Sequence, residues 1–497
     1  MKKYILIPIA LFCFSCENFL EREPETIITE ANFYETESDF QQAIIGAYAP
    51  LQEIYQEDWE MTELRSDNAY FIFDVANRGA QITEDLANFT VESNNETVLN
   101  KWQNNYLIVA RANEIIATID EADISSDVRN TVKGEALFLR ALAYFDLIKN
   151  FGGVPLFLEP ATSFDETFRN RVAFSEVLSQ VITDAEEAAT ILPGASDQVI
   201  GRATSGAAYT LLADVHLSQG DWAAAESALE NVINTDYSLL SDYADIFRPS
   251  NEGNEEIIFE VNYLEGTSQP LESTFPYSFL PELEDPAIIT GVSPAARNAG
   301  GSFNTPTPDL LNAYEDTVTD QRFAATIATY TGPSPLVGVE YNNTPYVNKY
   351  QHPHSIPNQT GQNWIIYRYA EVLLMMAEAK MEQGATGEAL TFINQVRQRA
   401  GLNDLGSVTR DDILQERRIE LAFENKRWYD LVRTGQAVST MNDFGSRVKQ
   451  NPQQYYFPEG SAPVEAAFNV NEDYLVYPIP ASEIIINPDL EQNPGYN

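Results

Sequence analysis

Residues 211–232 read LLADVHLSQGDWAAAESALENV, and residues 375–396 read MMAEAKMEQGATGEALTFINQV. Each stretch runs from an apolar, alanine-rich segment through a Gln-Gly pair into a second such segment. The two glycines, Gly220 and Gly384, are 384 − 220 = 164 residues apart, and the residues around them keep one internal register. A single copy would occur by chance in any alanine-rich helical chain. Two copies in one register predict that the same pair of helices occurs twice.

Both copies resemble a tetratricopeptide helix pair. A small residue, Ala225 or Ala389, follows five positions after the glycine and would let the two helices approach closely. Gly220-Asp221-Trp222 matches the usual turn into the second helix. We therefore predict helix pairs at about 207–234 and 368–400.

Apolar residues spaced by three and four predict further helices over 31–261 and 363–435. One of these helices ends at Gly152-Gly153-Val154-Pro155, because glycine and proline stop a helix. By contrast, 262–362 is rich in proline and tyrosine with little helical period, and 436–497 is also irregular. Long loops of this kind are uncommon unless they carry function. We expect a mainly α fold, one body over 31–497, in which a tetratricopeptide-like scaffold of helix pairs packs against an irregular, loop-rich half.

The N-terminus has the pattern of a secreted lipoprotein. Met1-Lys2-Lys3 gives a positive start, an apolar run follows from Tyr4 to Phe12, and Cys16 closes the leader. That run is too short to span a bilayer, which takes about 20 apolar residues. We predict a lipoprotein signal peptide at 1–15, lipid attachment such as palmitate on Cys16, and a polar tether at 16–30. The alternative is an ordinary signal peptide in which the cysteine is incidental.

The charge balance excludes one class of ligand. The chain has 74 acidic and 30 basic residues, which gives a formal net charge of −44. Such a surface repels phosphate backbones, so nucleic acid is a poor candidate partner. If the chain is cut before Cys16, only one cysteine remains and no internal disulfide can form. Stability must then come from burial of the core.

Motifs of catalysis and of metal or cofactor binding are missing from the sequence. It contains no Gly-x-Ser-x-Gly elbow, no phosphate-binding loop and no His-Glu-x-x-His zinc helix. Paired carboxylates could hydrolyse a glycoside, but with 74 acidic residues some pair always exists. His352-Pro353-His354 could offer two metal ligands, although the stiff proline favours a chance arrangement in a loop. We expect no catalytic residues, no metal and no cofactor.

The chain resembles the SusD/RagB-like surface lipoproteins of the Bacteroidota, and the resemblance covers essentially the whole mature sequence. The matching segments are ELRSDN at 63–68, GEALFLRA at 134–141, FGGVPL at 151–156, RYAEVLL at 368–374, INQVR at 393–397, ERRIELAFE at 416–424, RWYDL at 427–431, YPIP at 477–480 and QNPGY at 492–496. The resemblance implies a SusD-like fold whose loop-rich half binds oligosaccharides without cleaving them. It also implies a lipid-anchored place on the outer face of the outer membrane, beside a SusC-type TonB-dependent transporter as partner.

Ligand residues of this family tend to come from the loop after the first helix and from the long insertion. Aromatic rings there can stack on sugar rings, while polar groups exchange hydrogen bonds with hydroxyls. The matching candidates are Asp67, Asn68, Tyr70, Phe71, Phe275, Tyr277, Phe279, Tyr341 and Tyr346. For each aromatic residue the alternative is that it packs only its own loop.

Other conspicuous residues are interpreted as structural. Trp102 has helical spacing with its apolar neighbours and is expected in the core, as are Trp364, Trp428 and Tyr429, which we place in helices. Arg417 and Arg418 lie beside Glu416 and Glu420 and are expected to form ion pairs along a helix surface.

Two function classes stay open. One is a surface glycan-binding protein, for which the net charge favours a neutral glycan over a sulfated or uronic one. The other is a tetratricopeptide-type adaptor of the envelope. Within the first class, a member that binds a peptide or another nutrient is a further alternative.

Overall fold

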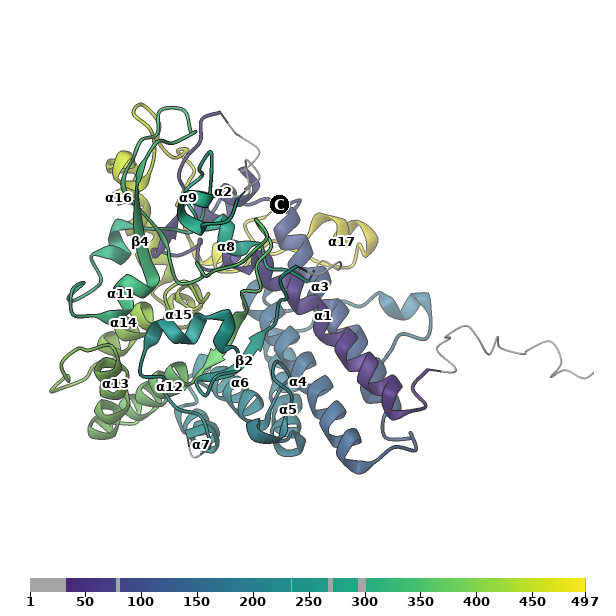
Figure 1. The fold of residues 1–497 in the computed structure, drawn as a ribbon. Helices are drawn as coiled ribbons and strands as arrows, with labels where there is room; N and C mark the ends of the chain where they lie inside the picture. The colour runs from purple at the N-terminus through teal and green to yellow at the C-terminus, as the bar shows by residue number, and fades with distance from the viewer. Residues whose placement is uncertain (1–32, 77–80, 234, 267–270, 294–300, 497) are drawn as a thin grey trace, which may run out of the picture.

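The structure is a computed structural model, and it describes residues 33–76, 81–233, 235–266, 271–293 and 301–496. Helices form the body of the molecule, and loops with short strands cover its upper part in Figure 1. The predicted mainly α fold is therefore confirmed. In the described ranges no helix is both long and apolar enough to span a bilayer. The predicted signal peptide (1–15), the tether (16–30) and Cys16 lie outside them.

The scaffold consists of long helices in which successive members pack on each other. α1 begins at a capping box, in which Thr36 and Asp39 each bond the other's backbone amide. The bounds are α1 Glu37–Met61, α2 Gln81–Asn88, α3 Glu96–Thr118, α4 Ser126–Phe151, α5 Phe174–Ile191, α6 Ser205–Ser218, α7 Trp222–Ile233, α12 Tyr369–Glu382, α13 Thr386–Arg399, α14 Arg410–Glu420, α15 Arg427–Arg433 and α16 Ala437–Gln450.

The two repeats form the helix pairs α6/α7 and α12/α13, and α7 packs against α12. Gly220 and Gly384 both have positive φ, 71° and 83°, at the turn between the helices of their pair. Such a conformation suits glycine, which has no Cβ to clash. Ala225 and Ala389 are completely buried where the paired helices meet. The two copies, far apart in sequence, therefore build one continuous part of the scaffold.

The described residues form three two-stranded antiparallel sheets: β1 (Ala69–Tyr70) with β3 (Thr305–Pro306), β2 (Ile257–Val261) with β6 (Trp364–Arg368), and β4 (Ile327–Gly332) with β5 (Tyr341–Val347). β2 and β6 lie where we predicted helix, within 31–261 and 363–435, so the prediction is wrong there. Both strands are buried along their whole length. They therefore lack the apolar and polar alternation of a strand that has one exposed face. Periodicity alone does not distinguish such a buried strand from a buried segment of helix.

The segment 262–362 is mostly loop, as predicted, but it contains the β4/β5 hairpin. Besides β3, its other described elements are short helices: α8 Phe275–Ser278, α9 Ala287–Thr290, α10 Pro308–Leu311 and α11 Gln321–Thr326.

The prediction that 436–497 is irregular is wrong over α16, while α17 (Ala481–Ile486) is only a short helix. The buried positions of α16 are Ala437, Met441, Phe444, Gly445 and Val448, which is the spacing of one helix face. Glycine, asparagine, serine and threonine lower the helix propensity of this segment. Burial of that face outweighs the low propensity.

Gly445 is expected to tolerate no side chain. A Cβ at this position would lie 2.1 Å from Cβ of Phe468, which is itself buried. The variant Gly445→Ala should lower the free energy of unfolding by about 2 kcal/mol, because overpacking in a core costs about 1 to 3 kcal/mol. Urea unfolding curves measure this change. The control is Gly387→Ala in α13, where the added methyl group meets nothing within 4 Å. Equal stabilities of the two variants would contradict the prediction.

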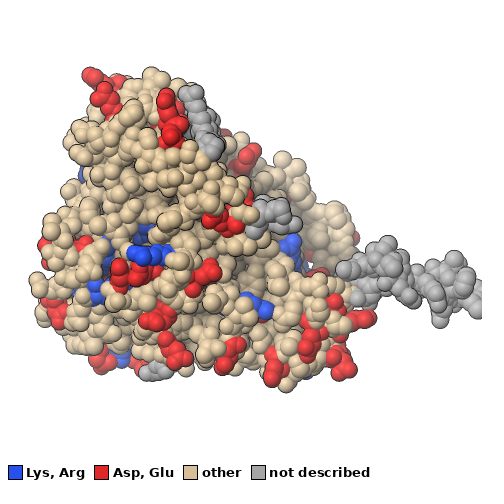
Figure 2. Space-filling view, in the orientation of Figure 1, with Lys and Arg blue, Asp and Glu red and all other residues tan. Residues whose placement is uncertain are grey.

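Among the charged side chains on the face in Figure 2, acidic ones are more widespread than basic ones. The reason is the composition, 74 acidic against 30 basic residues. In the described ranges nine of the chain's 30 lysines and arginines are buried: Arg65, Lys101, Arg140, Arg322, Lys349, Arg368, Arg397, Arg399 and Arg417.

Candidate functional site

Two of the predicted ligand residues, Asp67 and Asn68, lie in the interior just after α1 and are engaged with other side chains. Asp67 pairs with Arg427 (Oδ1 to Nε, 2.8 Å) and Arg418 (Oδ2 to Nη2, 3.0 Å). Burial raises the pKa of Asp67, but the two guanidinium groups outweigh it and hold that pKa below its ordinary value. Asn68 donates to Glu63 at 2.9 Å and accepts from Arg418 Nε at 2.7 Å.

The predicted aromatic residues Tyr70, Phe71, Phe275 and Phe279 are also buried. The ring of Tyr70 lies 4.3 Å from that of Phe71, and its hydroxyl donates to Asn88. Phe275 and Phe279 pack around other rings of the core. In this structure none of the four offers an exposed ring face, and a role in ligand binding stays a prediction.

The remaining three candidates lie together in the long insertion. Tyr277 is buried, and its hydroxyl shares a 2.7 Å hydrogen bond with Nε2 of His354. Half-buried Tyr346, on β5, packs against the cluster of Tyr277 and Leu280. Its hydroxyl has no hydrogen-bond partner among the described residues. Tyr341, at the start of β5, donates its hydroxyl to the carbonyl of Glu282 at 3.0 Å.

A groove of about 290 Å³ runs along the β4/β5 hairpin. Figure 1 shows β4 in the loop-rich upper part of the molecule. The groove is bounded by Ile72, by 338–345 and by 453–459. Tyr341 forms part of its apolar wall with Ile72 and Tyr456, whose side chains pack in one cluster. The backbone bond from Phe73 N to the carbonyl of Tyr456 at 3.2 Å ties the segment after β1 to the C-terminal segment.

The rim of the groove is polar and contains no lysine or arginine among the described residues that line it. Asn342 and Gln453 are exposed, and neither amide has a hydrogen-bond partner in the described part of the chain. Glu340 and Glu459 are the charged residues of the described lining. An amide both donates and accepts hydrogen bonds, as a sugar hydroxyl does. The groove therefore suits a neutral, hydroxyl-rich ligand better than an anion.

Comparison with known families matches both parts of the chain. Residues 255–496 match the model of the SusD family, and residues 18–217 match a second model described as starch-binding, associating with the outer membrane. SusD-like protein P2 of Formosa agariphila is 30% identical to the chain, over 100% of both sequences. The chain belongs to the SusD family. The resemblance that the motifs indicated is thus confirmed.

Two further SusD relatives have names that state a ligand. The starch-binding protein SusD of Bacteroides thetaiotaomicron is 25% identical, over 73% of this chain and 72% of its own. A solved structure titled laminarin-binding SusD-like protein is 26% identical, with a TM-score of 0.75, and covers 93% of this chain and 100% of its own. The mainly α, SusD-like fold is therefore shared with a solved member of the family.

The structure places the tryptophan, tyrosine and histidine residues that the sequence of this SusD-family chain singled out. Trp102, Trp364 and Trp428 are buried, which confirms the core assignment. Trp364 lies in β6 and not in a helix, so that part was wrong. Tyr429 is only partly buried and lines a cavity. The described residues hold no cluster of three metal-ligating side chains, and His352 bonds the carbonyl of Lys349.

Arg417 and Arg418 form ion pairs, as predicted, but not along a helix surface. Arg417 is buried and pairs with Asp430 (2.9 Å) and Glu371 (3.1 Å), whereas Arg418 reaches Asp67. Their partners come from other elements because this face of α14 points into the protein, where a cation needs a buried anion.

Sequence reasoning missed Asn342, Gln453 and Tyr456 as groove residues. The signal that could have found them is weak, namely an Asn-Asn pair at 342–343 and a Tyr-Tyr-Phe run at 455–457. These segments lie more than a hundred residues apart, and only the folded chain brings them together.

Proposed function

We propose that this SusD-family protein captures a neutral oligosaccharide or polysaccharide in the groove along the β4/β5 hairpin and does not cleave it. The observation that carries the proposal is the lining of the groove. It combines a tyrosine wall with two unpartnered amides and lacks a basic side chain among its described residues. Anionic glycans would meet Glu340 and Glu459 there and be repelled.

The relatives support a glycan as the ligand class, since one is named for starch and another for laminarin. Laminarin and starch are both neutral glucans, which agrees with the charge of the groove. Tyr341 contributes to the groove wall, whereas half-buried Tyr346 on the same strand lies outside the groove lining and packs against Tyr277 and Leu280.

The cellular setting follows from the same proposal. Lipid on Cys16 would hold the protein on the outer face of the outer membrane, beside a SusC-type TonB-dependent transporter to which it delivers the glycan. Association with the outer membrane is part of the description of the family model that matches 18–217.

The first test is affinity gel electrophoresis of the full-length protein in a polyoxyethylene detergent, which contains no sugar. Gels would contain laminarin, amylopectin or, as the anionic polymer, alginate. A neutral glucan should retard the protein and alginate should not. Replacing Asn342 and Gln453 together by alanine should weaken retention about tenfold, since each lost hydrogen bond is worth about 0.5 to 1.5 kcal/mol.

The matched control is Asn231→Ala, an exposed asparagine at the end of α7, on the helical side of the molecule. It should bind as the wild type does. Equal retention of the double variant and the control would place binding outside the groove. If no glycan retards the wild type, the adaptor or a peptide-binding member becomes the better explanation.

A further inference from the structure

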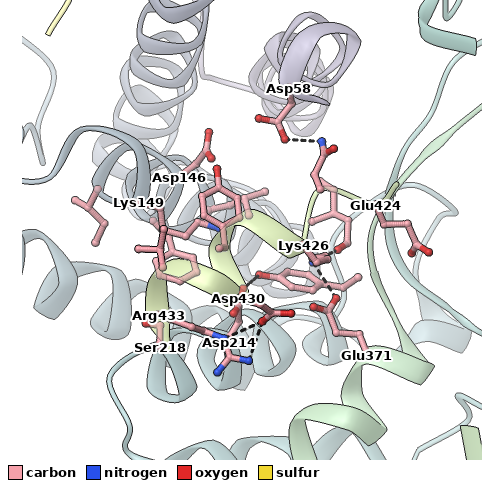
Figure 3. Close-up of a pocket in the computed structure, with 18 of the residues that line it drawn as sticks. Asp58, Asp146, Lys149, Asp214, Ser218, Glu371, Glu424, Lys426, Asp430 and Arg433 are labelled. Atoms are coloured by element: carbon pink, nitrogen blue, oxygen red, sulfur yellow. Dashed lines mark hydrogen bonds and ion pairs between the residues drawn. The ribbon is translucent and has the colours of Figure 1, made fainter. Parts of the chain in front are cut away.

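A second cavity, of about 250 Å³, lies inside the helical scaffold and not in the loop-rich half. Its walls come from α1, α4, α6, α15 and β6. Figure 3 shows Lys149 and Asp146 on one wall and Lys426 and Glu371 on the opposite one. Its exposed lining residues are Phe174 and Gln219, so the cavity meets solvent between the start of α5 and the end of α6.

The cavity is lined by polar groups that the protein itself does not satisfy. Nη1 of Arg417 and Oδ1 of Asn425 have no hydrogen-bond partner, although both side chains are more than nine-tenths buried. The hydroxyl of Tyr55 and the ammonium group of Lys149 also lack a hydrogen-bond partner among the described residues. Since buried polar groups are normally paired, these groups call for water or a ligand.

The charges of the lining disfavour an ionic ligand. Arg417 pairs with Asp430 and Glu371, and Lys426 pairs with Glu371 at 2.8 Å. No carboxylate of the described residues lies within salt-bridge distance of Lys149, and its ammonium lies 4.1 Å from the ring centre of Tyr429. Burial lowers the pKa of Lys149, while Asp214 and Asp146 act in the opposite direction. An anion would meet these carboxylates, and a cation would meet Lys149.

The shape and chemistry of the lining fit a ring with apolar faces and polar edges. Tyr55 stacks on Trp364 with the ring planes at 29°, and both line the cavity beside Tyr367. The hydroxyl of Tyr367 donates to Asp214 Oδ2 at 2.9 Å, which leaves Oδ1 of Asp214 as an acceptor. The volume would hold roughly eight waters and lies below the range of about 300 to 1,000 Å³ usual for drug-sized ligands.

We propose that this cavity is a second binding site that takes one neutral sugar ring. Tyr55, Lys149, Asp214 and Asn425 would exchange hydrogen bonds with its hydroxyls. The site is too small for a polymer and lies in the helical scaffold, so it would respond to free sugars and not to the chain held in the groove. The inference stands on its own lining and does not require the groove proposal to be correct.

The test is saturation-transfer NMR of D-glucose, D-galactose, D-mannose and D-xylose with the full-length protein in the same polyoxyethylene detergent. Concentrations should reach about 50 mM, because so small a ligand is expected to bind with a dissociation constant on the order of millimolar. At least one of the four should show saturation. The variants Lys149→Met, which removes the ammonium, and Ser218→Trp, which fills the cavity, should each weaken the signal at least about tenfold.

The control is Lys449→Met, the same substitution at an exposed lysine of α16, which should leave the signal unchanged. The groove variant with alanine at 342 and 453 should also keep it, whereas the two cavity variants should keep their retardation by a neutral glucan. These two comparisons distinguish a wrong assignment of the cavity as a sugar site from a wrong assignment of the groove as the glycan site. A cavity that binds none of the four sugars, a signal insensitive to both cavity variants, or saturation of glycine instead of a sugar would each overturn the proposal.

Discussion

Replacing Arg368 by methionine is expected to lower the free energy of unfolding by about 3 to 5 kcal/mol, the cost of removing one partner from a buried ion pair. Arg368 ends β6 and is completely buried. Its guanidinium bonds Glu424 through Nε at 2.7 Å and Nη2 at 2.9 Å, and Glu256 through Nη1 at 2.9 Å. It also bonds both the side chain and the backbone carbonyl of Glu420.

The loss is large because Arg368 belongs to a balanced network. Five buried cations face five buried anions on α11, β6, α13, α14 and the adjoining loops: Arg322, Lys349, Arg368, Arg397 and Arg399 against Glu256, Asp320, Glu416, Glu420 and Glu424. Arg368 and Lys349 outweigh the effect of burial and hold the pKa of Glu424 below its ordinary value. Without Arg368, the buried carboxylates of Glu256, Glu420 and Glu424 lose a shared cation, and an uncompensated buried charge is costly.

The measurement is the shift of the urea midpoint, with Arg248→Met as the matched control. Arg248 is 52% exposed and pairs with Asp245 at 3.0 Å on the surface. An exposed pair of this kind is worth about 0 to 1 kcal/mol, so the control should stay near the wild type. The interpretation of the network would be wrong if both variants lost the same stability.

Cys16→Ala is expected to abolish lipid attachment and display of the protein on the cell surface. The thiol of Cys16 is the proposed site of acylation, and alanine has no sulfur to which a lipid could be attached. Incorporation of labelled palmitate and digestion of intact cells by proteinase K measure the two effects in a host from the Bacteroidota. Both should fall to the level of cells that lack the protein.

Cys13→Ala provides the control, since it is the other cysteine of the chain and lies within the predicted leader. It should be lipidated and displayed as the wild type is. Continued palmitate labelling of Cys16→Ala, or loss of labelling in Cys13→Ala, would show that the anchor was assigned to the wrong residue.

The helical scaffold could be predicted because its signals are local. The glycine turn and the alanine five residues later lie within one helix pair, so the residues at 211–232 and 375–396 were enough to place α6, α7, α12 and α13. β6 and α16 were missed for opposite reasons. The run Trp364 to Tyr367 is buried on both faces and carries no alternation, while α16 owes its helix to burial and not to propensity.

The candidate groove could be predicted only in part. Tyr341, which the sequence singled out because tyrosine in a long insertion is a local feature, lies in the groove lining, and its role in ligand binding stays a prediction. Asn342 and Gln453 meet only because the segment after β1, the β4/β5 hairpin and the C-terminal segment pack together. Burial of Asp67 also depends on contacts distant in sequence, since its partners Arg418 and Arg427 lie more than three hundred residues later.

The unequal distribution of charge seen on the molecular face has a consequence for crowding. The chain carries 74 acidic and only 30 basic residues, so acidic side chains remain in excess on the surface although residues of both signs are buried. Two copies that approach each other therefore present surfaces of one sign. At physiological ionic strength this repulsion extends over about 8 Å. Salt concentration should thus set how densely copies of the protein can cover a surface.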